Sequence, residues 1–410
     1  ENLQKAFKNS AFSRSVRQLT QPFYLVCGYG ETGHRICQAL DNMGYRVVVL
    51  ELKPEQLADI ELRRYSTEIL GLAADAANPD KLQMAGLTYS NCRGVLALTN
   101  DDQANLAIAI AARLLAPSLP VLARAKTRET AANMQSFGTH HIIHAVRKFG
   151  DYLSLAMHSP AAYHLLVWLT GLPGTTIDRQ RDPPKGNWIL CGYGNFGQSL
   201  TESIAREGLP VTVIDLRPED EFQAHEPGVR WIQGDGTGGE ILTHAGIEHA
   251  SGIIAATSSD IDNLSIAVTA RQLNPNIFII LRQNSVISRP LIDTFEADIT
   301  MVPSEIVAQE CLAILTTPLL APFLSELYKA KEDWCEALLK QLTDKFGWEV
   351  REVWSVRINL SEARALYRIL MKGERVKLCD TFMNPSNREQ PLQCQILRLE
   401  RDDNTVKLLP

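Results

Sequence analysis

The stretch FYLVCGYGETG (residues 23–33) joins an apolar run rich in strand-forming residues to three glycines spaced as G-x-G-x-x-G. This spacing alone is a weak signal, because many ordinary turns contain it. Here a segment with apolar residues at helical spacing follows (34–44), and a second strand-like run, YRVVVLE (45–51), ends in an acidic residue. A strand, a glycine turn, a helix and a second strand with a terminal carboxylate are typical of a nucleotide-binding Rossmann unit.

Each glycine of the turn has its own role in this interpretation. Gly28 permits the tight turn, Gly30 lets the backbone approach a pyrophosphate, and Gly33 lets the helix pack closely on its strand. The phosphates then lie at the helix N-terminus, where the first N–H groups have no partner within the helix. Glu51, 18 residues after Gly33, is placed to bind ribose hydroxyls.

The same pattern returns in the second half of the chain. ILCGYGNFG (189–197) repeats the glycine turn, and the following VTVID ends at Asp215, again 18 residues after the last glycine. Two further pairs of segments match in the same order, ELKPE with DLRPE and NLAIAIAARLLAP with NLSIAVTARQLNP (51–55 with 215–219, and 105–117 with 263–275). Matching blocks at nearly constant offset indicate an internal duplication. The expected fold class is α/β, with two tandem Rossmann-like, doubly wound parallel sheets.

The ordered set of motifs resembles the RCK domains, also called KTN or TrkA-N domains. The motifs are CGYGETG, ADAANPDKLQMAGL and TNDDQANL in the first copy, and CGYGNFG, GDGTGGEILTHAGI and TSSDIDNL in the second (27–33, 74–87, 99–106, 191–197, 234–247 and 257–264). The resemblance covers residues 23 to about 310. It implies ligand-binding lobes that pair into rings and gate a potassium channel or transporter.

Candidate ligand-binding residues gather at the predicted carboxyl ends of the strands, where open parallel sheets bind their ligands. In the first copy they are Gly28, Tyr29, Gly30, Glu31, Thr32, Gly33, Glu51, Lys53, Asp75 and Arg124. In the second copy they are Gly192, Tyr193, Gly194, Asn195, Phe196, Gly197, Asp215, Arg217, Asp235 and Arg282. We predict no catalytic residue and no metal ligand among them.

Some of the polar residues near these strand ends have two interpretations. Asp75 and Asp235 either contact the ligand or stabilise a turn. Asn105 and Asn263 are interpreted as satisfying the backbone near a helix start rather than as ligand contacts.

The charged residues narrow the choice of ligand. Arg124 and Arg282 close strand-like runs and are available to a phosphate or a carboxylate, with phosphate favoured. Lys53 and Arg217 each follow the ribose acid by two residues, where a basic side chain can hold a 2′-phosphate, but the acids oppose one. We therefore expect NAD(H) or an adenine nucleotide (AMP, ADP or ATP) rather than NADP. A divalent cation bound with it stays unassigned.

The two copies differ at their glycine loops. Glu31 lies inside the first loop, where a carboxylate repels phosphate, whereas Asn195 is the neutral counterpart in the second. The second copy also keeps the Gly234-Asp235 turn, which is Ala74-Asp75 in the first. The second lobe is therefore expected to be the better nucleotide site.

Composition excludes several other classes of protein. A net charge of −6 gives no reason to expect nucleic acid as a partner. The eight cysteines form no C-x-x-C pair, which argues against a zinc site or a disulfide framework. HHIIH (140–144) suggests a metal site, but its counterpart DITMV (298–302) has no histidine, so structural or exposed histidines are favoured.

The expected organisation has five parts: an N-terminal linker (1–22), a first lobe (23–146), a helical crossover and linker (147–186), a second lobe (187–303) and a helical and α/β C-terminal domain (304–410). The linker carries four basic residues and no acid after Glu1, as expected beside a membrane helix. The crossover reads as two helices broken at Ser159-Pro160. In the C-terminal domain, strands are expected around the helix SEARALYRIL (348–358, 374–380 and 392–403 around 361–370).

The resemblance implies a non-enzymatic function. It implies a cytoplasmic gating ring of an inner-membrane potassium channel, formed by dimers or tetramers of the chain, with the pore domain upstream of residue 1. A peripheral subunit of a potassium uptake transporter is an alternative. An NAD-dependent oxidoreductase is a weaker one, because the second half is another Rossmann lobe and the last hundred residues show no catalytic grouping.

Overall fold

The computed structural model describes residues 2–171, 174, 176–177, 181–218, 228–317, 319–377, 383–384, 387–391, 394–400 and 406–408. The chain divides into two compact units. One comprises Glu1–Met157 and Gln180–Leu312, and the other His158–Arg179 and Ala313–Pro410. The expected crossover (147–186) is therefore divided between the units. The first residues of the expected C-terminal domain, 304–312, belong to the unit that holds the two lobes.

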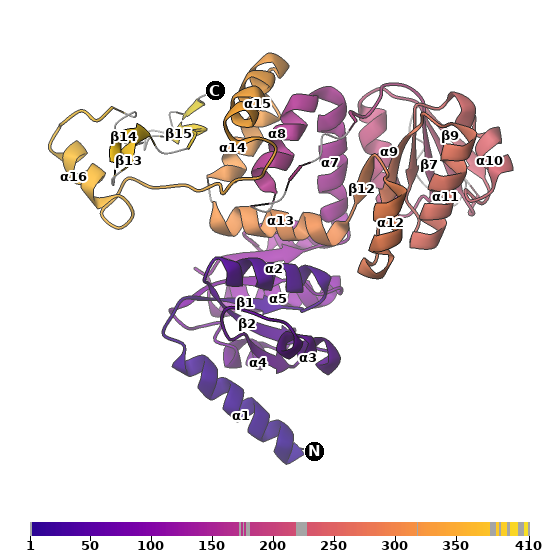
Figure 1. The fold of residues 1–410 in the computed structure, drawn as a ribbon. Coiled ribbons are helices and arrows are strands. Elements are labelled where there is room, and N and C mark those ends of the chain that lie inside the picture. Colours follow the sequence, from indigo (N-terminus) through magenta and orange to yellow (C-terminus); the bar gives the residue numbers. More distant parts are fainter. Residues whose placement is uncertain are drawn as a thin grey trace. The chain divides into compact units, whose positions relative to one another are not determined.

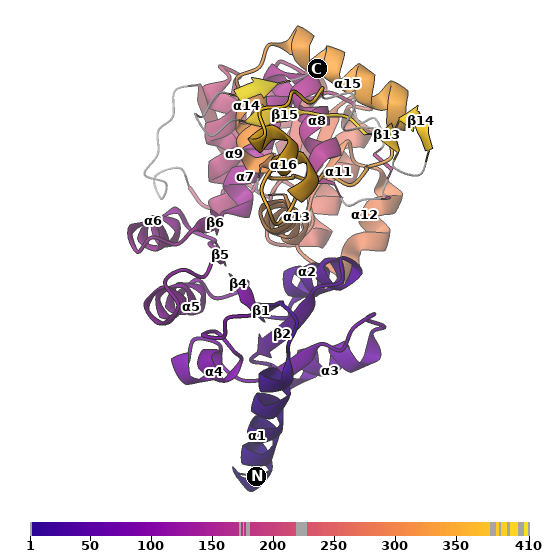
Figure 2. The same cartoon turned by 90° about the vertical axis from the view of Figure 1, so that its left-hand side faces the viewer.

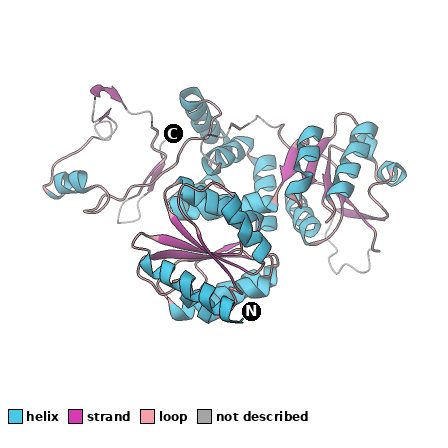
Figure 3. Ribbon diagram, turned by 60° about the horizontal axis from the view of Figure 1, so that its bottom comes forward, coloured by secondary structure: helices cyan, strands magenta, loops and turns pink. Residues whose placement is uncertain are grey.

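The first lobe is a six-stranded parallel sheet in the order β3-β2-β1-β4-β5-β6. Its strands are β1 (Phe23–Cys27), β2 (Arg46–Glu51), β3 (Leu70–Ala73), β4 (Cys92–Ala97), β5 (Val121–Arg124) and β6 (His141–Ile143). Its helices are α2 (Glu31–Asn42), α3 (Pro54–Leu62), α4 (Pro79–Met84), α5 (Asp102–Leu115) and α6 (Arg128–Ser136). Figure 3 shows these helices on both faces of the sheet.

The second lobe repeats this topology in the order β9-β8-β7-β10-β11-β12 (Figure 1). Its strands are β7 (Trp188–Cys191), β8 (Val211–Asp215), β9 (Val229–Gln233), β10 (Gly252–Ala255), β11 (Phe278–Arg282) and β12 (Ile299–Met301). Its helices are α9 (Asn195–Arg206), α10 (Gly239–His244), η2 (Ile247–His249), α11 (Asp260–Leu273), η3 (Val286–Ser288) and α12 (Arg289–Phe295). The predicted pair of doubly wound parallel sheets is confirmed.

The central strands are apolar along their whole length because helices cover both faces of the sheet. Every residue of β1 is buried, and so is every residue of β7. In each lobe the strand order reverses beside the first strand, between β1 and β4 and between β7 and β10. This reversal opens the crevice in which doubly wound folds bind ligands, at the carboxyl ends of the strands.

The expected N-terminal linker contains a helix, α1 (Asn2–Gln18). Phe12 and Val16, four residues apart, are buried in the hydrophobic core of the first lobe. Just after the helix, the Asn91 side chain donates a hydrogen bond to the carbonyl of Leu19 at 2.7 Å. Figure 2 shows α1 running from the lobe to the N-terminus of the chain. The segment is thus a helix attached to the first lobe by its own apolar face.

The remaining helices are α7 (Ala145–His158), α8 (Pro160–Thr170), α13 (Pro303–Thr316), α14 (Leu320–Leu327), α15 (Glu332–Phe346) and α16 (Arg364–Met371). The predicted break at Ser159-Pro160 is confirmed. In the second unit the Glu332 carboxylate accepts hydrogen bonds from the Ser159 hydroxyl and from the Ala161 N–H, so it caps the start of α8. Two short antiparallel pairs follow, β13 (Met383–Asn384) with β14 (Asn387–Pro391) and β15 (Arg398–Glu400) with β16 (Val406–Leu408).

The strand predicted over residues 348–358 is wrong. Only Glu349 forms a β-bridge, to Thr176, and the rest of that segment joins no sheet. The other two predicted strands, 374–380 and 392–403, lie partly outside the described residues. Within the described part of the chain, no single helix is long and apolar enough to cross a membrane, and α13 with α14 meets the test only as a pair bent by 119°.

Candidate functional site

The two glycine loops have nearly the same backbone geometry. Gly28 and Gly192 have φ values of +99° and +95°, which other residues rarely adopt. A Cβ at Gly33 would lie 2.0 Å from the carbonyl oxygen of Gly28, and a Cβ at Gly197 would lie 2.1 Å from that of Gly192. These four glycines are therefore required by the turn and by the close packing of helix on strand, as predicted from their spacing.

Gly30 and Gly194 differ from the other glycines of the loops. Their φ values of −70° and −78° suit any residue. A Cβ at either position would meet no described atom within 4 Å. Neither the backbone nor packing within the described chain therefore requires glycine here, and the space beside each residue is open to a ligand that approaches the backbone.

Each loop leads directly into the N-terminus of a twelve-residue helix, α2 after Gly30 and α9 after Gly194. Neither helix has a side-chain hydrogen bond at its N-cap. The first-turn N–H groups and the positive end of the helix dipole are thus available to an anion at both loops.

In the first lobe, the acid at the end of β2 holds the glycine loop. Glu51 Oε2 accepts a hydrogen bond from the Tyr29 N–H at 2.6 Å, and Oε1 accepts one from the Lys53 N–H at 2.9 Å. Glu51 is buried. The spacing predicted that this carboxylate lies beside the loop but gave no sign that it binds the loop backbone.

In the second lobe, Asp215 makes the same contact with the loop. Its Oδ2 accepts a hydrogen bond from the Tyr193 N–H at 2.6 Å, and its Oδ1 accepts from the Arg217 N–H and Nε, both at 3.0 Å. Burial opposes ionisation of Asp215, but these donors prevail and lower its pKa. Arg217 also donates to the Tyr193 carbonyl at 3.1 Å, so its guanidinium is bound to the loop itself.

The two arginines at the sheet edge keep their positive charge available. Arg124 Nη1 donates to the Asn100 side chain at 3.0 Å, and Arg282 Nη1 donates to the Ala256 carbonyl at 3.4 Å. Among the described residues, neither forms an ion pair with a carboxylate, and Arg282 Nε is buried without a hydrogen-bond partner. Burial lowers the pKa of both guanidiniums. Both guanidiniums therefore keep N–H donors for an anionic ligand, a phosphate or a carboxylate.

Four further candidates have buried side chains: Thr32, Tyr29, Tyr193 and Phe196. Tyr193 packs edge-on against Trp231, with ring centroids 4.5 Å apart. Phe196 lies beneath the Arg282 guanidinium, 5.1 Å from ring centroid to Cζ. The side chains of these four residues therefore support the loops, and only their backbones remain to contact a ligand.

Asp75 and Asp235 stabilise their own turns. Asp75 Oδ1 accepts from the Ala77 N–H at 2.8 Å, and Asp235 Oδ1 accepts from the Thr237 N–H at 2.9 Å and hydroxyl at 2.8 Å. The Thr237 donors lower the pKa of Asp235. Both aspartates are exposed, so the turn accounts for them without a ligand.

The buried asparagines join neighbouring strand ends. Asn105 accepts from the Thr99 N–H at 2.9 Å and donates to the carbonyls of Thr99 and Arg124, both at 3.0 Å. Asn263 makes the equivalent bonds in the second lobe. Both side chains are fully buried, which confirms that they satisfy the backbone.

The histidine motif lies on and around β6, as expected. His140 Nδ1 accepts from the Val121 N–H at 3.3 Å, and His144 Nδ1 accepts from the Arg147 N–H at 3.1 Å. Within the described ranges, no three His, Cys, Asp or Glu side chains are placed to hold a metal ion. These two contacts support the structural interpretation.

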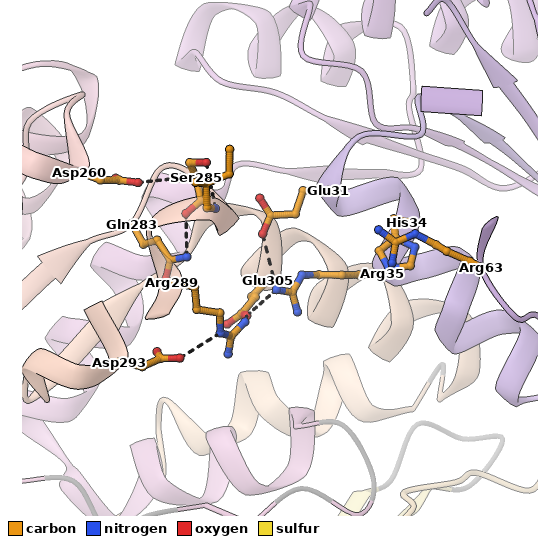
Figure 4. A network of polar contacts seen from close by, with 11 residues as sticks. Glu31, His34, Arg35, Arg63, Asp260, Gln283, Ser285, Arg289, Asp293 and Glu305 are labelled. Atoms are coloured by element: carbon orange, nitrogen blue, oxygen red, sulfur yellow. Dashed lines mark hydrogen bonds and ion pairs between the residues drawn. The ribbon is translucent and has the colours of Figure 1, made fainter. Parts of the chain in front are cut away.

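An ion-pair network connects the first glycine loop with residues that follow β11 and β12 (Figure 4). Arg35 Nη2 lies 3.5 Å from Glu31 Oε1 and 2.9 Å from Glu305 Oε1. The same Glu305 oxygen lies 2.9 Å from Arg289 Nη1, and Arg289 Nε lies 3.4 Å from Asp293. Nothing in the sequence indicated this network, because its members are up to 274 positions apart.

His34 on α2 provides a prediction of pH dependence. Its Nε2 lies 2.8 Å from Arg63 Nη1 and its Nδ1 lies 3.1 Å from the Tyr65 hydroxyl. Burial, Arg63 and Arg35 lower the pKa of His34 to about 4. Because an unfolded histidine titrates near about 6.5, only the unfolded state gains the proton as pH falls from there, so the stability of α2 should decrease between about pH 6.5 and pH 4. Hydrogen exchange of α2, corrected for the intrinsic pH dependence, measures this.

In the same experiment, His34→Gln should flatten the pH dependence, since glutamine does not titrate. An identical pH profile in the wild type and the variant would contradict the assignment.

The fold and the site together define a protein with two Rossmann-like lobes, each with a glycine loop before a helix N-terminus. The family model described as the TrkA-N domain matches residues 24–145 and 188–303. The chain belongs to this family, which confirms the resemblance drawn from the motifs.

Several curated relatives are named as potassium channel or potassium uptake proteins. Potassium channel protein 1 of Methanocaldococcus jannaschii is 31% identical over 149 residues, which are 36% of this chain and 45% of the relative. The Trk system potassium uptake protein TrkA homolog of Pyrococcus horikoshii is 28% identical over 137 residues, which are 32% of this chain and 60% of the relative. The chain thus spans less than half of the channel relative.

Solved structures share the fold over most of the chain. The GsuK channel bound to NAD matches with a TM-score of 0.57 and 18% identity, over 73% of this chain and 64% of that one. GsuK bound to ADP matches with a TM-score of 0.55 and 20% identity, over 72% and 69%.

Proposed function

We propose that the chain is the ligand-sensing, gating-ring region of a potassium channel, in which NAD(H) or an adenine nucleotide bound to the lobes controls potassium conduction. The observation that carries this proposal is the open space beside Gly30 and Gly194. A glycine that the described structure does not need, placed before an uncapped helix N-terminus, is suited to a phosphate that approaches the backbone.

The other residues of the site have roles consistent with this ligand. Glu51 and Asp215 keep acceptor capacity for ribose hydroxyls while they hold the loops. Arg124 and Arg282, which make no ion pair with a described carboxylate, stand at the same sheet edge for the phosphates. The second lobe should bind more tightly, because Asn195 replaces the carboxylate of Glu31.

The relatives support a potassium channel as the protein that the lobes regulate. Potassium channel protein 1 and GsuK are named as channels, and GsuK structures are described as bound to NAD and to ADP. In this proposal the pore precedes residue 1, the lobes lie in the cytoplasm, and copies of the chain pair into a closed ring. The nucleotide then shifts the ring between conformations by the difference in its affinity for them, without chemical turnover. The TrkA homolog supports a second candidate, a regulatory subunit of a potassium uptake transporter.

Potassium flux through the full-length protein in proteoliposomes tests the proposal. Adding NAD, NADH, AMP or ADP should change the flux of the wild type. Gly30→Val together with Gly194→Val should remove this response and leave the selectivity for potassium over sodium intact, because the loops are not part of the pore. Light scattering checks that the variant keeps the wild-type assembly. A nucleotide response that survives in the double variant would overturn the sensor function.

A further inference from the structure

We propose that Arg35, which pairs with both Glu31 and Glu305, links two properties of the protein. One is the charge of the nucleotide that the first glycine loop binds, and the other is the strength of the contact between α2 and α13. The inference rests on the proposed function in one respect, that this loop binds a nucleotide. It adds a preference of the first loop among nucleotides of different charge, and an electrostatic coupling between that loop and Glu305.

Geometry places Arg35 between two carboxylates. Glu31 is the first residue of α2, directly after Gly30, and Arg35 lies one turn later on the same side of the helix. A single guanidinium nitrogen, Nη2, faces both Glu31 at 3.5 Å and Glu305 at 2.9 Å (Figure 4). The side chains of the three residues are only 25–29% exposed, so solvent screens them less than an open surface pair.

Glu31 is the less well neutralised of the two carboxylates. Its Oε1 is buried and accepts no hydrogen bond from any described residue. Glu305, by contrast, is shared by Arg35 and Arg289, both at 2.9 Å. Burial opposes the charge on Arg289, but Glu305 and Asp293 prevail and raise its pKa. This arginine therefore stays charged and pairs with those two carboxylates. Arg35 therefore lies closer to Glu305 than to Glu31, and Glu31 is neutralised only in part, by Arg35 and by its attraction to Arg124.

That residual charge lies where the phosphates would bind. The N-terminus of α2 attracts an anion through its free N–H groups, and the Glu31 carboxylate beside it repels the same anion. The repulsion grows with the charge of the phosphate group, so it opposes ADP more than the less charged pyrophosphate diester of NAD. The second loop has Asn195 at this position and lacks the effect.

Glu305 and the loop consequently compete for Arg35. When the arginine leaves Glu305 it can neutralise Glu31 fully, and ADP then binds better. Because binding linkage is reciprocal, ADP at the first loop must weaken the Arg35–Glu305 pair by the same factor. The charge of the bound nucleotide thereby determines how strongly Arg35 on α2 pairs with Glu305 on α13.

Calorimetric titration of the whole chain in a Gly194→Val background isolates the first loop. Glu305→Gln should strengthen ADP binding by about fivefold, a typical size for such coupling, and should change NAD binding less. Glu31→Gln should strengthen ADP binding at least as much. In the Glu31→Gln background, Glu305→Gln should have little further effect, because no residual charge remains to be neutralised.

Glu310→Gln is the matched control. Glu310 lies on the same helix α13 and pairs with Lys148 at 3.1 Å, outside the network, so ADP affinity should not change. Unchanged ADP affinity in Glu305→Gln, or an equal gain in Glu310→Gln, would overturn the coupling while leaving the proposed function intact. Absence of binding in the Gly194→Val chain, with binding in the wild type, would show that the first loop takes no nucleotide and would also overturn it. A wild-type chain that binds neither ADP nor NAD would refute the proposed function itself.

Discussion

Gly194→Val is expected to abolish nucleotide binding at the second lobe while the lobe stays folded. The valine side chain would occupy the open space beside residue 194 and keep a pyrophosphate from the helix N-terminus. We expect a loss of affinity of about 100-fold or more, which corresponds to about 3 kcal/mol. Isothermal titration with NAD and ADP in a Gly30→Val background, where only the second loop remains, measures it.

Two further glycines serve as controls for this variant. Gly238 is the N-cap of α10 and also has a negative φ, −82°, so Gly238→Val reports the cost of a β-branched cap alone. Gly197→Val should instead disrupt the loop, because its Cβ would lie 2.1 Å from the Gly192 carbonyl oxygen. If Gly194→Val binds nucleotides as tightly as the wild type, the pyrophosphate does not pass over this loop.

Asn263→Ala is expected to have the largest effect on stability, a loss of about 3 kcal/mol in the second lobe. The substitution removes the hydrogen bonds of Asn263 to the Thr257 N–H and carbonyl and to the Arg282 carbonyl. Of these groups, the Thr257 carbonyl keeps a donor, Asn284 Nδ2 at 3.3 Å. Hydrogen exchange of β10 and β11 reports the local free energy of opening, which suits a chain of several lobes better than a global unfolding curve.

Asn276→Ala provides the comparison for that measurement, since Asn276 is exposed in the same lobe and should change stability by less than about 0.5 kcal/mol. If the two variants exchange at the same rate, the buried asparagine does not hold the strand ends together.

The sequence predicted the lobes well because their signals are local and repeated. The strand, glycine turn and helix follow one another within a few residues, and the second copy supports each assignment made in the first. The role of Asn105 was predictable for the same reason. Its partners Thr99 and Arg124, at the ends of β4 and β5, belong to the motifs that recur in both copies. Periodicity and spacing therefore fixed the parallel sheets and the turn geometry of the site.

The parts that sequence could not predict depend on contacts between distant residues. Arg35 and Glu305 look like ordinary surface charges, because no spacing rule links α2 to α13. The alternating apolar residues of 348–358 suggested a strand, but alternation does not supply the neighbour that a strand must pair with. A weak signal for α1 was present, the four-residue spacing of Phe12 and Val16, although the basic composition of that segment favoured a linker.

The attachment of α1 to the first lobe has a mechanical consequence. A helix of 17 residues is roughly 25 Å long, and the buried side chains of Phe12 and Val16 fix its C-terminal half to the lobe. A flexible tether would absorb small displacements as changes in its own shape. A stiff rod anchored in a core instead turns with the body that holds it, so a rotation of the first lobe by a few degrees becomes a translation of the far end of α1 by an ångström or more.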